Sequence, residues 1–197
     1  QSKQDLIDKI NRVPFDSEAA DKGTCFNEIV DCLIEHRNTD KMKVTKVKDN
    51  NKVVALSAEY NNRAFTYPIE LCKEMADYFK GAITQYYCEA ILPTKYGNVK
   101  LYGYLDELMP TCIHDIKTTS RYEAYKFRDH WQHIVYPYCL RNEGNDVTRF
   151  EYDIVKWGKH MSYDFFTICH SDDRREEESC GHPLVCNRDP SSLCSSG

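Results

Sequence analysis

Two runs of alternating apolar and polar residues, each with an aspartate, constrain the fold of this chain most strongly. Residues 99–105 alternate in this way and end at Asp106. Residues 112–116 do the same, contain Asp115 and are followed directly by Lys117. A period of two is typical of β-strands, on which residues two apart share a face. The pattern therefore predicts two neighbouring strands that bring two carboxylates and an ammonium group close together.

A helix is expected after these strands, over residues 122–141, and it carries two further polar side chains. Gln132 and Tyr136 lie four residues apart, so they share one face of that helix. Aspartate oxygens suit a hard divalent cation, and a lysine beside them can contact the attacking water. An Asp-x-Lys triplet alone arises by chance in about half of chains this long, but an upstream Gly-x-x-Asp and a downstream Gln-x-x-x-Tyr make coincidence far rarer. The combination predicts a metal-dependent nuclease site.

The remaining elements follow from periodicity and from turn residues. Thr24 is a suitable N-cap for a helix over residues 24–36, and Gly81 is a suitable stop for a helix over residues 68–80. This order predicts a mixed α/β fold (α+β), with helices flanking a central mixed β-sheet in one domain over residues 1–167. A small β-meander is expected within it, at about residues 41–67. Expected strands cover residues 43–48, 53–56, 64–67, 85–92, 95–108, 111–118 and 148–156.

In this order the motifs resemble those of the PD-(D/E)XK nuclease superfamily, and within it the RecB-like branch of phage-type exonucleases. The resemblance covers about residues 20–156 and rests on three quoted segments. They are Gly103-Tyr104-Leu105-Asp106, Asp115-Ile116-Lys117, and the pair Gln132 and Tyr136.

That branch also carries an N-terminal helix with a Gly-x-x-x-His-x-x-x-Glu motif, which aligns here with Gly23. Asn27 then stands in place of the family histidine, and Asp31 stands in place of its glutamate. An amide oxygen and a shorter carboxylate can still bind Mg²⁺. Glu28 is a rival for the acidic role.

The resemblance implies a restriction-endonuclease-like core that hydrolyses DNA phosphodiester bonds with Mg²⁺ or Mn²⁺. It implies that Lys117 orients the attacking water, while Gln132 and Tyr136 position the nucleophile or the DNA. The catalytic residues it implies are Asp106, Asp115, Lys117, Gln132 and Tyr136. The metal ligands it implies are drawn from Asp106, Asp115, the Ile116 carbonyl, Asp31, Asn27 and Glu28.

The biological role implied by the resemblance is that of an exonuclease in recombination, repair or DNA end processing. It would act in the cytoplasm of a bacterial cell or a phage-infected host, with a single-strand annealing recombinase or another recombination protein as a partner. The alternative is a catalytically weakened protein of the same fold that binds nucleic acid or a protein.

The net charge of −5 does not exclude DNA as a ligand, because local charge governs binding more than the sum. Basic side chains crowd two segments, one before and one after the expected catalytic strands. The alternative is that the first group of lysines solvates a hairpin and protects an edge strand from pairing. The candidate DNA-binding residues are Lys43, Lys46, Lys48, Arg121, Lys126 and Arg128.

The ten cysteines would indicate disulfides in a secreted chain, but most of them are scattered singly through apolar segments. Isolated cysteines of this kind are typical of buried free thiols in a reducing compartment. No apolar run approaches the roughly 20 residues that cross a membrane, and the polar start lacks the pattern of a secretory signal. The composition therefore favours a cytoplasmic protein.

The sequence changes in character over residues 168–197, which are polar and predict a disordered tail. Cys180, Cys186 and Cys194 are spaced too widely for typical zinc or iron–sulfur sites. The sequence therefore disfavours zinc and an iron–sulfur cluster, and Mg²⁺ or Mn²⁺ is the expected cofactor.

Each candidate residue also has a purely structural alternative. Asp115 and Lys117 can form a solvated pair on one strand face, and Asp106 can be a turn acid. Gln132 can be an exposed helix residue and Tyr136 a core aromatic. The polar residues of the first helix can be ordinary surface positions.

Overall fold

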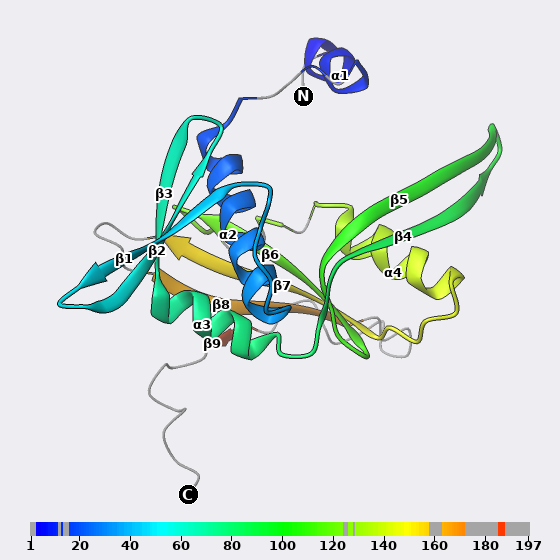
Figure 1. Cartoon of the computed structure of the whole chain (residues 1–197). Coiled ribbons are helices and arrows are strands. Elements are labelled where there is room, and N and C mark those ends of the chain that lie inside the picture. The colour runs from blue at the N-terminus through cyan, green and yellow to red at the C-terminus, as the bar shows by residue number, and fades with distance from the viewer. Residues whose placement is uncertain are drawn as a thin grey trace, which may run out of the picture.

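The computed structural model describes residues 3–11, 13, 16–123, 126–127, 129–157, 163–171 and 185–187. This part of the chain forms two β-sheets with helices packed against them (Figure 1). The mixed α/β class expected from the order of elements is therefore confirmed. A short helix, α1 (Lys3–Ile10), precedes the sheets. None of the described helices is long and apolar enough to cross a membrane.

The smaller sheet is the predicted three-stranded meander. It is antiparallel throughout and consists of β1 (Lys43–Asp49), β2 (Lys52–Tyr60) and β3 (Arg63–Pro68). Both of its turns contain two asparagines with positive φ, for example 46° and 65° at Asn50 and Asn51. Asparagine tolerates this left-handed conformation better than most residues, and such turns match the twist of the flanking strands.

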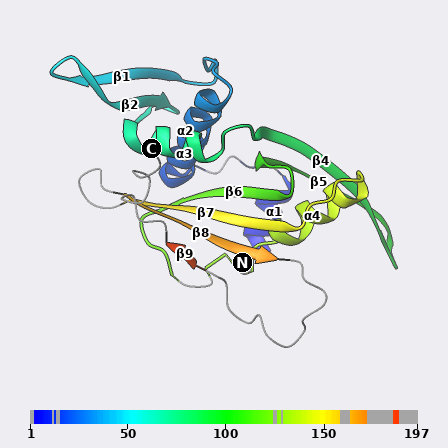
Figure 2. The ribbon, with the colours of Figure 1, turned by 90° about the horizontal axis from the view of Figure 1, so that it is seen from below.

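The larger sheet has six strands of mixed direction, in the order β4-β5-β6-β7-β8-β9. β6 and β7 are parallel, because the segment between them crosses over through α4 (Gln132–Asn142), and the other neighbours are antiparallel. β5 pairs with β6 only near its end, and the preceding part of β5 projects with β4 as a long hairpin (Figures 1 and 2). The strands are β4 (Ile83–Thr94), β5 (Gly97–Leu108), β6 (Cys112–Thr119), β7 (Arg149–Trp157), β8 (Tyr163–Ser171) and β9 (Val185–Asn187).

The helix α2 (Glu18–Ile34) begins earlier than its apolar pattern predicts. The Ser17 side chain accepts a hydrogen bond from a backbone N–H of the first turn and so caps the helix. The expected start at Thr24 is wrong because the turns before it are polar and carry no apolar signal. A Cβ at Gly23 would lie 3.0 Å from Thr118 Oγ1, so glycine at this position lets α2 approach β6 closely.

The helix expected over residues 122–141 is correct only from Gln132 onward. The described residues before it form turns and irregular structure. The Phe127 ring is buried there, 5.4 Å from the Tyr152 ring and 6.2 Å from the Tyr122 ring between centroids. These aromatic contacts with the sheet replace the regular helical spacing. The other predicted helix is confirmed as α3 (Ile69–Tyr78), with φ of 86° at Gly81 after it.

The larger sheet lies between two helical layers, α2 with α3 on one face and α4 on the other (Figure 2). Ile116 belongs to the core formed with α2 and α3, whereas Ile113 belongs to the core under α4. Because residues two apart share a face, Asp115 and Lys117 lie on the same side of β6 as Ile113. The sheet therefore directs both candidate residues toward α4.

The range 168–197, predicted to be a disordered polar tail, contains some regular structure. β8 extends through Ser171, and β9 pairs with residues 166–168 of β8 in an antiparallel register. The expectation fails at these positions because a three-residue edge strand is held by backbone hydrogen bonds and needs no apolar periodicity. Residues 172–184 and 188–197, including Cys180 and Cys194, lie outside the described residues, as does the side chain of Cys186.

Candidate metal-dependent active site

The centre of the candidate site is a closed network of three side chains from β6 and α4. Asp115 is 3% exposed, and its Oδ2 lies 2.5 Å from Lys117 Nζ. Gln132 Nε2 donates to Asp115 Oδ1 at 2.7 Å, and Lys117 Nζ donates to Gln132 Oε1 at 2.9 Å. Each side chain contacts the other two. The solvated-pair alternative for Asp115 and Lys117 is thus disfavoured, because both groups are oriented by a third.

Asp106 enters this region where the pairing of β5 and β6 ends. The last paired residues are Glu107 and His114, and beyond them the backbone N–H of Ile116 donates to Asp106 Oδ2 at 2.8 Å. The carboxylate thus takes the place of a strand partner at the point of divergence. The residue as a whole is half-buried at this point. Asp106 and Asp115 lie close enough for the charge of one to act on the other, as the motifs predict. The Ile116 group in contact with Asp106 is the N–H, whereas the resemblance implies the carbonyl of this residue as a ligand.

Tyr136 lies one helical turn after Gln132 and packs against the backbone of β5. A Cβ built at Gly103 would lie 2.4 Å from Tyr136 Cε1, which is closer than two carbon atoms can approach. Only glycine fits beneath this ring. The glycine of Gly-x-x-Asp and the tyrosine of Gln-x-x-x-Tyr are therefore complementary parts of one contact.

Burial and mutual repulsion raise the carboxyl pKa values at the site. Burial first and then the Asp115 charge raise the pKa of Asp106 to about 8, although Lys117 and the Ile116 N–H lower it. Burial also raises the pKa of Asp115, against the opposing effect of Lys117. Two carboxyls that resist ionisation side by side form a site where a divalent cation would displace protons.

A second pair of carboxyls, from α2 and β5, adjoins the first. Asp31 is 1% exposed and Glu107 is fully buried. Burial is the largest cause of a pKa of about 10 for Glu107, and the Asp31 charge is the next. Burial also raises the pKa of Asp31 to about 6, while a hydrogen bond with Glu107 lowers it. The two acids therefore share a proton at neutral pH, and the Asp31 charge also raises the pKa of Asp106.

Glu107 was not among the site residues predicted from the sequence. Its position directly after Asp106 was the available signal, but strand alternation places the two side chains on opposite faces. The packing of α2 against β6, whose His114 is paired with Glu107, brings Glu107 to Asp31, and only the folded chain reveals this.

The donor atoms present suit a hard cation such as Mg²⁺ or Mn²⁺. Asn27 Oδ1 is buried and has no donor among the described residues. The carboxyl oxygens of Asp31 and Glu107 are buried as well, and beyond the proton that the two acids share, only the Gln85 side chain in the described part of the chain is near enough to donate. Asn27 and Asp31 lie four residues apart on α2, so they share a face. Buried polar atoms without donors are rare in native proteins. An all-oxygen set of this kind matches the ligand preference of Mg²⁺ and Mn²⁺.

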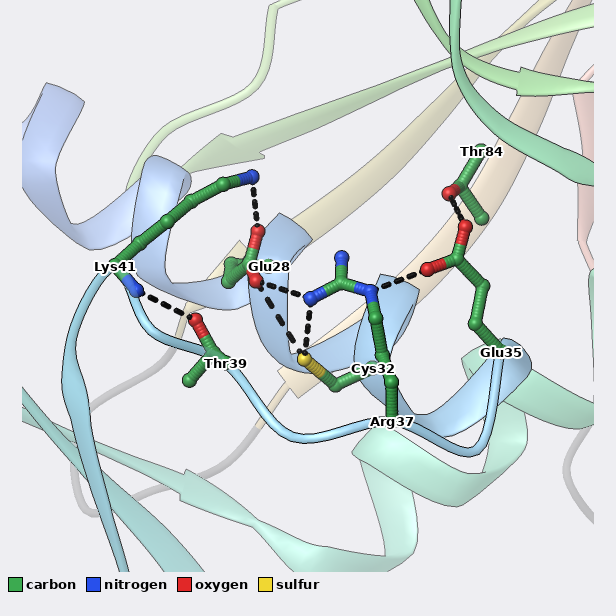
Figure 3. Close-up of polar contacts among 7 residues, drawn as sticks. All are labelled: Glu28, Cys32, Glu35, Arg37, Thr39, Lys41 and Thr84. Carbon is green, nitrogen blue, oxygen red and sulfur yellow. Dashed lines mark hydrogen bonds and ion pairs between the residues drawn. The ribbon is translucent and has the colours of Figure 1, made fainter.

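Glu28, the rival acid of α2, is held away from this role. Arg37 Nη1 lies 2.6 Å from one of its oxygens and Lys41 Nζ lies 2.5 Å from the other (Figure 3). These two cations lower the pKa of Glu28 to about 2, against the effect of burial. Cys32 and Arg37 complete the cluster with a contact of 3.1 Å. Glu28 therefore anchors the segment after α2.

The predicted DNA-binding residues lie on two separate parts of the fold. Lys43, Lys46 and Lys48 are exposed on β1, the edge strand of the smaller sheet, and Lys43 pairs with Glu59 at 2.9 Å. On the segment after β6, Arg121 pairs with Glu123 at 2.9 Å. Lys126 Nζ donates to Thr119 Oγ1 at 2.9 Å and to the Arg121 carbonyl at 3.0 Å. Arg128 lies outside the described residues.

Another group with metal-ligating atoms lies on the opposite face of β6. Cys112, His114 and Glu151 are all buried, and one potential ligand atom from each lies within 4.8 Å of the others. Here the polar atoms already have protein partners. His114 Nδ1 lies 2.9 Å from Asp153 Oδ2, and Glu151 contacts Arg149 and the Tyr78 hydroxyl, both at 3.3 Å. The contacts in place account for this cluster without an ion.

No family model matches this chain, and no curated protein or solved structure is significantly similar to it. The comparisons therefore neither support nor oppose the superfamily resemblance drawn from the motifs.

Proposed function

We propose that this chain is a divalent-metal-dependent nuclease that hydrolyses phosphodiester bonds in DNA through a PD-(D/E)XK-type active site. One observation carries the proposal. Asp106, Asp115 and Lys117, predicted from separate motifs, meet at the divergence of β5 and β6, and Gln132 fixes two of them. Such an arrangement has no evident structural purpose, because it gathers buried acids whose ionisation is costly.

The chemistry follows from the roles these groups can take. Asp106 and Asp115 would hold the cation, together with oxygens of α2. A bound Mg²⁺ lowers the pKa of its water and stabilises charge on the phosphate. Lys117 Nζ is fixed between Asp115 and Gln132, so it can orient the attacking water and offset the developing negative charge. Tyr136 stabilises the position of α4 through its contact with Gly103.

The proposal extends to the fold of the core, the biological role, the partner and the location of the protein. The larger sheet, with α2 and α4 on opposite faces, would be a restriction-endonuclease-like core. An exonuclease in recombination, repair or end processing fits a chain whose long hairpin stands beside the site. A single-strand annealing recombinase or another recombination protein is the partner we expect. A cytoplasmic location belongs to the same proposal.

The second candidate is a binding protein of the same fold with a weakened site. Asn27 and Asp31 favour it, because they replace a histidine and a glutamate in the motif of the first helix. Against it stands the intact Asp106, Asp115 and Lys117 set, which a protein that only binds would not need to keep oriented.

Cleavage of end-labelled linear and closed-circular DNA in Mg²⁺, Mn²⁺ or EDTA tests the proposal. We expect metal-dependent cutting by the natural chain and its loss in Lys117→Ala. Lys73→Ala, an exposed lysine of α3, serves as the matched control and should cut normally. Absence of cutting by folded protein with either metal would favour the binding-only alternative.

A further inference from the structure

The long β4–β5 hairpin has two unlike faces. Its inner face, with Cys88, Ala90 and Leu101, packs in the core under α4. Its outer face carries large apolar side chains that stay exposed: Tyr102 is 57% exposed and Tyr104 is 58% exposed. The hairpin projects from the body of the protein in both views (Figures 1 and 2). An exposed apolar surface on such an arm indicates a binding function.

The exposed aromatic rings form one cluster across the two strands. Tyr87 is paired directly with Tyr104, and their ring centroids are 5.3 Å apart. The Tyr102 ring lies 6.4 Å from the Tyr87 ring. Directly opposite residues share a face, so all three rings lie on the outer side of the hairpin. Ile91, 52% exposed, extends this surface toward the tip.

We propose that this outer face binds the single-stranded part of the DNA substrate by stacking bases on Tyr87, Tyr102 and Tyr104. The inference rests on the proposed nuclease function and names where the substrate strand lies. Base–aromatic stacking is the usual means by which proteins hold single strands, since every base has a π-face that is accessible only outside the duplex.

Continuity with the candidate site favours a DNA strand as the occupant. Tyr104 stands two residues before Asp106 on the same strand, so the row of rings ends next to the strand position of that carboxylate. Trp131, 74% exposed, stands immediately before Gln132 on the other side of the site. Exposed aromatic residues therefore adjoin both motifs.

Spacing and charge agree with this occupant. Residues two apart on a strand are about 6.8 Å apart, which is about two stacking distances of a nucleic acid strand. An extended single strand can therefore place one base on the exposed side of each ring. The segment 86–104 carries Lys95, Lys100 and Glu89, and Lys100 pairs with Glu89 at 2.6 Å, so its formal net charge is +1 in a chain of net charge −5.

Fluorescence anisotropy of a labelled oligothymidylate, measured in EDTA so that nothing is cut, tests the proposal. Tyr102→Ala and Tyr104→Ala should each weaken binding by about five-fold to a hundred-fold. Phenylalanine at either position should retain the affinity, because the ring remains. Leucine should lose it as alanine does, because apolar contact without a π-face does not stack.

Three outcomes would overturn the proposal. In the first, the alanine variants bind oligothymidylate as tightly as the natural chain. In the second, the leucine variants bind as tightly as the natural chain. In the third, the natural chain itself binds no oligothymidylate. In the last case, sedimentation that shows a dimer lost in Tyr104→Ala would assign the face to a second copy of the chain.

Failure of the nuclease function is distinguishable from these outcomes. Tyrosine-dependent binding by a chain that cuts no DNA with any metal would overturn the nuclease and leave the strand-binding face. Normal DNA cutting by the natural chain, together with unaffected oligothymidylate binding in the alanine variants, would support the nuclease and overturn the strand-binding face.

Discussion

Replacing Glu107 by glutamine should stabilise the protein as the pH rises. Burial and the Asp31 charge raise the pKa of Glu107 from 4.5 to about 10. The folded chain therefore keeps a proton that the unfolded chain has released throughout the window between these values. Stability falls with rising pH in that window, by about 1.4 kcal/mol per pH unit for one proton.

Between pH 6 and pH 8 the natural chain should lose about 3 kcal/mol of stability relative to Glu107→Gln. Glutamine has the shape of the protonated acid and can still donate to Asp31, but it does not titrate. Urea unfolding of both proteins in EDTA at pH 6, 7 and 8 measures this difference directly. A difference that stays constant over this range would refute the conclusion that Glu107 is a buried, protonated acid.

Three further predictions follow from the site. Gly103→Ala should lower the free energy of unfolding by about 1–3 kcal/mol by crowding the Tyr136 ring. A double-mutant cycle in urea unfolding should show that Tyr136→Ala removes this loss of stability. Additive effects of the two substitutions would contradict the contact. Mg²⁺ at about 100 times its Kd should raise the melting temperature of the natural chain by about 5–10 °C, and a similar rise in Asp106→Asn would place the ion elsewhere. Glu28→Gln should destabilise the protein by about 1–2 kcal/mol at pH 7 through the loss of its pairs with Arg37 and Lys41. Because the pKa of Glu28 is lowered from 4.5 to about 2, this difference in stability should disappear as the pH falls through that range. A difference in stability that persists near pH 2 would count against the pairing.

The parts of the site that follow from local periodicity were predictable. Strand alternation places Asp115 and Lys117 on one side of β6, and the adjacency of β5 and β6 brings Asp106 to them. The turn residues likewise predict the meander, because asparagine at positive φ is a local preference.

The remaining features depend on tertiary contacts that no local pattern encodes. Glu107 meets Asp31 only because α2 packs against β6, the strand that pairs with β5 at Glu107. From the sequence, Glu28 and Asp31 are equally possible metal ligands. In the structure, Arg37 and Lys41 from the segment after α2 form ion pairs with Glu28 and not with Asp31. The aromatic contacts of Phe127 override the helical spacing before Gln132 for the same reason.

Binding of Mn²⁺, followed by the loss of its free electron paramagnetic resonance signal, tests most directly whether Asp106 and Asp115 form a divalent-cation site. The natural chain should bind about one or two ions, and Asp106→Asn and Asp115→Asn should each weaken or abolish this binding. Glu28→Gln should bind as the natural chain does. Unchanged binding in both asparagine variants, or none by the folded natural chain, would contradict the metal site and with it the proposed nuclease.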